Sequence, residues 1–80
     1  MHLILLTRAY CHLCDEMRAA LAPLAAAAGM TIEEIDVDGD PTLEARWGEA
    51  VPVLLAGESE LCRYRLDRAA LAAYLASAAG

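Results

Sequence analysis

Residues 3–14, LILLTRAYCHLC, join a short apolar run to two cysteines that are three positions apart. The run from Met1 to Thr7 is bounded by polar residues, a pattern typical of a buried strand. Arg8 to Tyr10 then form a turn, and apolar residues at helical spacing follow from Met17 onward. This segment predicts a strand that passes into a helix, with both cysteines at the junction.

The rest of the chain alternates between helix and strand patterns. Three helices are predicted, at residues 15–28, 41–47 and 68–78. Further strands are predicted at residues 31–37, 52–56 and 60–64. Asp40 and Asp67 are expected to cap the second and third helices. In the last strand, Leu61 and Cys62 should point to opposite faces of the sheet.

This order, β-α-β-α-β-β-α, predicts an α/β fold in a single domain, residues 1–80. Strands that are separated by helices are expected to pair in parallel, and the final hairpin is expected to be antiparallel. The expected architecture is a mixed four-stranded sheet with helices on its faces.

The net charge of −6, with arginine but no lysine, argues against nucleic acid and anionic membrane surfaces as partners. No apolar stretch approaches the roughly 20 residues that cross a bilayer. Neither the basic nor the long apolar region of a secretory signal is present, so we expect a cytoplasmic protein. Three cysteines are too few for a structural disulfide framework. Two of them close together indicate redox or metal chemistry instead.

A helix that begins near Cys11 would bring the sulfurs of Cys11 and Cys14 within disulfide range at its N-terminus. The unpaired N–H groups and the helix dipole there favour a thiolate, which makes Cys11 the expected nucleophile. Cys14, one turn further along, is then the resolving thiol. His12 adds positive charge when protonated, and Tyr10 is expected to shield Cys11 from water.

Val51-Pro52 is the second candidate feature. Proline is allowed at the first position of a strand, and this pair lies just before the third predicted strand. A trans bond is the common case for such a pair. A cis bond would turn the backbone toward the cysteines and leave the N–H and C=O of Val51 free to pair with an incoming peptide.

The whole chain resembles the glutaredoxin branch of the thioredoxin superfamily, and in particular the small bacterial glutaredoxin-like proteins with a Cys-His-Leu-Cys site. The resemblance rests on the segments Leu3–Arg8, Cys11–Cys14, Asp36–Asp38, Trp47–Gly48 ahead of Val51–Leu54, and the helix that begins at Asp67.

The resemblance implies a thiol–disulfide oxidoreductase with a thioredoxin-like fold, a cis peptide at Pro52, Cys11 as nucleophile and Cys14 as resolving cysteine. It implies no tightly bound cofactor, with glutathione as a candidate co-substrate. The expected partner is a disulfide-containing protein or a glutathione mixed disulfide, and the chain is expected to be a monomer.

The sequence departs from typical glutaredoxins at three places. His12-Leu13 stands where they have Pro-Tyr, and Arg8 is the cation nearest to the site, where they have a lysine. Residues 62–65, Cys-Arg-Tyr-Arg, stand where they have a glycine pair that helps to bind glutathione. Arg8, Arg63 or Arg65 could hold a glutathione carboxylate by bidentate pairing.

Two other functions fit the same residues. Cys11 and Cys14, with His12 or Cys62, could hold Zn²⁺ or an iron–sulfur cluster, although a closed zinc site normally has four ligands. A non-catalytic scaffold that keeps the fold and binds a partner is the other alternative. Cys62 itself is expected to be a half-buried strand residue, and Trp47 a core residue or a wall beside the site.

Overall fold

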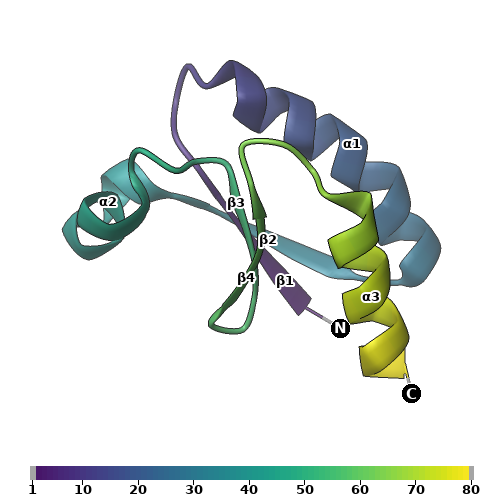
Figure 1. Cartoon of the computed structure of the whole chain (residues 1–80). Coiled ribbons are helices and arrows are strands. Elements are labelled where there is room, and N and C mark those ends of the chain that lie inside the picture. The colour runs from purple at the N-terminus through teal and green to yellow at the C-terminus, as the bar shows by residue number, and fades with distance from the viewer. Residues whose placement is uncertain (1, 80) are drawn as a thin grey trace.

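The computed structural model describes residues 2–79, with side chains up to Ser77. Its elements follow the order of the sequence prediction: β1 (His2–Thr7), α1 (His12–Ala28), β2 (Thr31–Asp36), the short 3₁₀ helix η1 (Val37–Gly39), α2 (Pro41–Trp47), β3 (Val53–Ala56), β4 (Ser59–Arg63) and α3 (Arg68–Ala79). Met1, which the first predicted strand included, and Gly80 lie outside the described residues. The predicted α/β architecture with a mixed four-stranded sheet is confirmed (Figure 1).

The four strands lie in the order β2-β1-β3-β4. The central strand β1 pairs in parallel with β2, with Leu3 opposite Ile32, and antiparallel with β3, with Leu5 opposite Leu54. The antiparallel pairing of β3 corrects the expectation that all strands separated by helices run in parallel. A parallel crossover needs a helix that returns along the sheet. Helix α2 has only 7 residues, about 10 Å of helix, so the chain re-enters the sheet at the end where β2 left it.

Alternation along β1 sends side chains to two separate cores. Leu3 and Leu5 pack with the apolar faces of α1 and α3 in the larger core, to which Met17 and Leu71 belong. Leu6 points the other way into the smaller core, against which Leu43 and Trp47 of α2 pack. We call these the α1/α3 core and the α2 core. In Figure 1, α1 and α3 lie on one side of the molecule and α2 on the other.

Strand β4 departs from simple alternation. A register shift lies between Leu54 and Leu55 of β3, so Leu54 faces Cys62 and Leu55 faces Glu60. This shift is a β-bulge, in which Leu61 is the extra residue of β4. A bulge redirects the side chain of the residue that it adds. Leu61 and Cys62 therefore both pack against the α1/α3 core, which corrects the prediction that they point to opposite faces.

The element ends differ from prediction where local hydrogen bonds take over. Helix α1 begins at His12 rather than Asp15, because Cys11 acts as its N-cap. Asp40 caps α2 and Asp67 caps α3, both as predicted. Among the described residues, no helix is both long and apolar enough to cross a membrane.

Candidate active site

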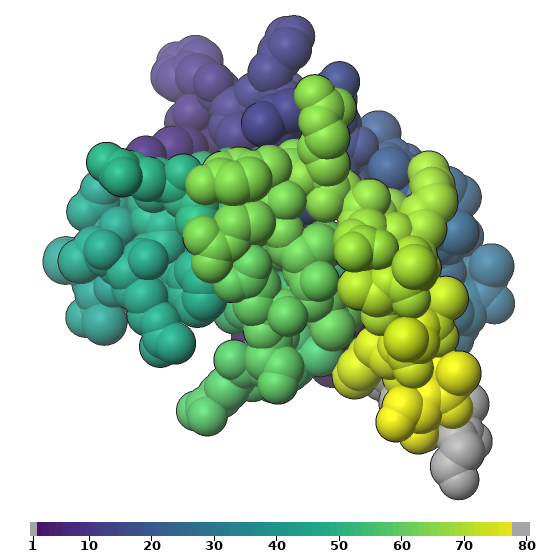
Figure 2. Space-filling view, viewed as in Figure 1, coloured from purple at the N-terminus to yellow at the C-terminus, as the bar shows by residue number. Residues whose placement is uncertain are grey.

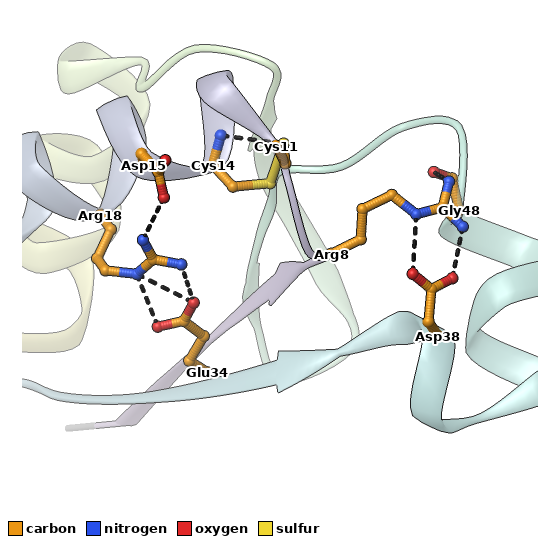
Figure 3. The surroundings of a disulfide bond; sticks show 8 residues. All are labelled: Arg8, Cys11, Cys14, Asp15, Arg18, Glu34, Asp38 and Gly48. Atoms are coloured by element: carbon orange, nitrogen blue, oxygen red, sulfur yellow. Dashed lines mark hydrogen bonds and ion pairs between the residues drawn. A yellow bond between two sulfur atoms is a disulfide. The ribbon is translucent and has the colours of Figure 1, made fainter.

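Cys11 and Cys14 are joined by a disulfide at the N-terminus of α1. Their Cα atoms are 5.2 Å apart, a usual separation for a disulfide. The Cys14 N–H donates a hydrogen bond to Cys11 Sγ at 3.1 Å (Figure 3). Cys11 Sγ is thus part of the disulfide and also accepts a hydrogen bond from one of the first N–H groups of the helix. These N–H groups have no partner inside the helix.

The two cysteines differ in exposure. Cys14 is 1% exposed and belongs to the α2 core, whereas Cys11 is half-buried and packs on the edge of that core. A reagent from solvent therefore meets Cys11 first. The N-terminal end of α1 favours an anion on this sulfur once the disulfide is reduced.

The Val51–Pro52 peptide bond is cis, as the resemblance implies. Both residues are buried, and Val51 lies in the α2 core together with Cys14. Within the described chain, the Val51 N–H and C=O make no hydrogen bond with the backbone, whereas the Pro52 carbonyl accepts one from Tyr64 N–H at 2.9 Å. The disulfide and an unpaired peptide group therefore border the same small core.

Arg8 lies beside the disulfide but is occupied by internal partners. Its Nε and Nη2 donate to the two carboxylate oxygens of Asp38 at 3.2 and 2.6 Å, and its Nη1 donates to the Gly48 carbonyl at 2.8 Å (Figure 3). The hydrogen bonds from Arg8 hold the pKa of Asp38 below its ordinary value. Arg8 thus ties the end of β1 to η1 and to the C-terminus of α2, and its role in holding a substrate carboxylate stays a prediction.

The other predicted substrate-binding residues are exposed. His12 lies at the surface in the first turn of α1. Tyr10 is fully exposed, at 106%, with a φ of 57°, so its ring points into solvent and does not shield Cys11, contrary to expectation. Arg63 is bound by the Glu60 carboxylate at 2.6 and 2.7 Å, whereas Arg65 has no side-chain partner among the described residues.

The sequence and the fold of this chain are similar to those of known proteins. Residues 2–76 match the family described as Glutaredoxin-like domain (DUF836). The chain belongs to this glutaredoxin-like family. An uncharacterized protein of Mycobacterium tuberculosis is 36% identical over 77 residues, which cover 90% of this chain and 79% of that protein.

Solved structures agree with the family. The solution NMR structure of protein Ne2328 from Nitrosomonas europaea shares 39% identity, with a TM-score of 0.82, over 91% of this chain and 88% of that one. The X-ray structure of protein XcR50 from X. campestris shares 34% identity, with a TM-score of 0.74, over 94% and 96% of the two chains. Thioredoxin 1 from Thermosipho africanus, at 22% identity and a TM-score of 0.68 over the full length of both chains, shares the fold.

The predicted membership of the thioredoxin superfamily is therefore confirmed. A thioredoxin-like fold with Cys11 and Cys14 at disulfide distance supports a redox-type function for this glutaredoxin-like chain.

Cys62 stands apart from the disulfide. It is half-buried, as predicted, and packs against the α1/α3 core rather than the α2 core. Burial raises the pKa of its thiol above the ordinary value. Within residues 2–79, no three His, Cys, Asp or Glu side chains are grouped so that they could share a metal ion. Among these residues, Cys62 is therefore not grouped with Cys11 and Cys14 into a metal site.

One arginine beside the site, Arg18, has a pairing that the sequence alone does not reveal. Arg18, on α1, donates to Asp15 at 2.7 Å and to the Glu34 carboxylate of β2 (Figure 3). These bonds hold the pKa of Glu34 below its ordinary value. The spacing of Asp15 and Arg18 is visible in the sequence, but the pairing with Glu34 depends on how α1 lies over β2.

Proposed function

We propose that this protein reduces disulfides by thiol–disulfide exchange, with Cys11 as the attacking thiolate and Cys14 as the resolving thiol. The observation that carries the proposal is the difference in exposure between the two cysteines. Cys11 is half-buried at the mouth of the helix N-terminus, whereas Cys14 is 1% exposed behind it. An incoming disulfide can reach only the first of them directly.

In the first step, the Cys11 thiolate attacks one sulfur of a substrate disulfide. A bond forms between Cys11 Sγ and that sulfur, and the substrate S–S bond breaks. The other substrate sulfur leaves with the electron pair and takes a proton from water. Helix α1 favours the attacking thiolate through its N-terminal N–H groups.

In the second step, the Cys14 thiol loses its proton and attacks Cys11 Sγ. The internal disulfide forms, and the substrate sulfur leaves as a second thiol. Two electrons have then passed from the protein to the substrate. The Cys11–Cys14 disulfide of the structure corresponds to this oxidised form.

The cycle closes when an external thiol reduces the internal disulfide. Two molecules of a monothiol such as glutathione, or one dithiol, supply the two electrons and two protons. No tightly bound cofactor takes part, because sulfur atoms carry both electrons.

The backbone of Val51 is the proposed docking point for the substrate. Its N–H and C=O have no backbone partner in the described chain, and Val51 shares the α2 core with Cys14. An extended substrate peptide could pair with both groups, as an added strand does at a sheet edge. Such pairing would align the substrate sulfur with Cys11 without reading the substrate side chains.

The experiment compares wild type with Cys14→Ser on two substrates. One is the mixed disulfide of glutathione with 2-mercaptoethanol, and the other is a protein with an internal disulfide. We expect wild type to reduce both. We expect Cys14→Ser to stop at the mixed disulfide with the protein substrate, because no second thiol remains to release it.

Activity of Cys14→Ser toward the glutathione substrate would indicate a route through one cysteine, with free glutathione as the resolving thiol. A wild-type protein that reduces neither substrate above the uncatalysed rate would refute the proposed function.

A further inference from the structure

The arginines of this acidic chain fall into two sets. Three donate hydrogen bonds to carboxylates: Arg8, Arg18 and Arg63. The other three have no side-chain hydrogen bond or ion pair within the described residues: Arg46, Arg65 and Arg68. A net charge of −6 leaves ample carboxylates for pairing, so three unpaired arginines call for a separate explanation.

All three unpaired arginines line hollows on either side of Tyr64. The first hollow, of about 370 Å³, is lined by Arg46, Glu49 and Tyr64 among others. Arg46 also stacks on the neighbouring Trp47, with its guanidinium 4.9 Å from the ring centre. The free charges here are one arginine and one glutamate, so this hollow is close to neutral.

The second hollow, of about 290 Å³, lies on the other side of Tyr64, against Met17 of α1. Arg65 and Arg68 line it together with one acid, Glu16. Its free charges sum to a positive value, in contrast to the surface as a whole.

Tyr64 forms the ridge between the two hollows. Its φ is 67°, a conformation that residues with a side chain rarely adopt, and the side chain is 45% exposed. Its N–H donates to the Pro52 carbonyl, which fixes the ridge beside the Val51–Pro52 loop. The segment that follows β4 stands out at the same end of the molecule as the start of α1 (Figures 1 and 2).

We propose that Tyr64, Arg65 and Arg68 select the substrate, and that they favour a disulfide in an acidic stretch of polypeptide. The proposal rests on the proposed function and names its substrate class. A peptide that pairs with Val51 and crosses the Tyr64 ridge meets an aromatic surface first and then two arginines that have no internal partner.

The distance along α1 sets where the substrate carboxylate lies. Cys11 and Met17 are six positions apart, about 9 Å along a helix axis. An extended chain advances about 3.3 Å per residue. The favoured carboxylate is therefore about three residues from the substrate cysteine.

The test uses short peptides with one central cysteine held in a mixed disulfide with 2-mercaptoethanol. One peptide has glutamate at the third residue on each side, the matched peptide has glutamine there, and a third probe is the mixed disulfide of glutathione. We expect wild type to reduce the glutamate peptide with the highest kcat/KM. We expect the preference over the glutamine peptide to fall by about two- to fivefold in Arg65→Ala and again in Arg68→Ala.

Arg18→Ala is the matched control. It removes the same charge, but from an arginine that is already paired with Asp15 and Glu34. This variant should keep the wild-type preference for the glutamate peptide. Tyr64→Gly should weaken binding of both peptides equally, because the ring contributes apolar contact rather than charge.

A binding measurement separates this proposal from the proposed function. The glutamate peptide with serine in place of cysteine is titrated into the oxidised protein and followed by NMR. Chemical-shift changes at Tyr64, Arg65 and Arg68 that weaken with added salt support the selection surface, even where no disulfide is reduced. Equal binding of the glutamate and glutamine peptides, or a glutathione probe that is reduced faster than the glutamate peptide, would overturn it.

Discussion

Cys11 and Cys62 are cysteines of the same small chain, but they lie in different surroundings on the two sides of the sheet. Cys11 caps a helix, is partly open to solvent and has a second sulfur within bonding distance. Cys62 lies on a bulged strand, packs against the α1/α3 core and has no disulfide partner. The local fold, rather than the residue type, gives the two thiols these different surroundings.

The largest expected effect comes from exchanging each thiol for a hydroxyl. Cys11→Ser should reduce disulfide exchange to the uncatalysed rate, because serine is no nucleophile toward sulfur at neutral pH. Cys62→Ser should leave the rate within about twofold of wild type. The rates are measured with the glutathione and protein disulfide substrates. A large decrease in the exchange rate of a normally folded Cys62→Ser variant would contradict this difference between the two thiols.

Alkylation of the reduced protein should separate the two thiols by a smaller factor. An ordinary cysteine thiol, with a pKa of about 8.5, is only about 3% thiolate at pH 7. Burial raises the pKa of Cys62, so its thiolate fraction at pH 7 is lower still, whereas the helix N-terminus favours the thiolate of Cys11. We expect iodoacetamide at pH 7 to label Cys11 at least about tenfold faster. Peptide mapping by mass spectrometry gives the two rates.

A glycine beside the site provides a test of how tightly that side of the sheet is packed. A Cβ at Gly48 would lie 2.6 Å from the Glu44 carbonyl oxygen, and the Gly48 carbonyl also accepts the bond from Arg8. We expect Gly48→Ala to lower the free energy of unfolding by about 1–3 kcal/mol in urea titrations. Gly39→Ala is the control, because a Cβ there meets no atom within 4 Å.

The smallest expected effect is a loss of stability in acid. Hydrogen bonds from Arg8, Arg18 and Arg63 lower the pKa values of three carboxyl groups: Asp38, Glu34 and Glu60. A lowered pKa in the folded state adds stability above the unfolded value of about 4, and this stability is lost as the pH falls toward the folded value. The thermal midpoint should therefore drop modestly between about pH 5 and pH 3.

Matched variants sharpen the acid prediction. Arg18→Gln should flatten this pH dependence, because Glu34 then loses its partner. Arg65→Gln should leave it unchanged, since Arg65 has no carboxylate partner in the described chain. An identical slope in both variants would contradict the assignment.

Much of the fold could be predicted because periodicity and capping are local. Asp40 and Pro41 predicted the start of α2, and the apolar run before Cys11 predicted β1. The antiparallel direction of β3 and the bulge at Leu61 could not be predicted, since they depend on how a short helix and a register shift fit the sheet.

In the site, too, local features could be predicted from the sequence, whereas contacts between distant residues could not. The cysteine spacing was visible in the sequence, and the resemblance to glutaredoxins pointed to Val51-Pro52. The roles of the arginines were not visible. Arg8, which was predicted to bind substrate, donates to Asp38, while Arg18 reaches Glu34 from a distant part of the sequence. Only the folded arrangement distinguishes these paired arginines from Arg65.

The most direct test of Cys11-centred exchange is to trap its covalent intermediate. Reduced Cys14→Ser is mixed with a protein disulfide substrate, digested without reductant, and mapped by mass spectrometry. We expect a stable mixed disulfide on Cys11 and none on Cys62. A substrate adduct on Cys62, or no adduct on Cys11 in a folded protein, would contradict it.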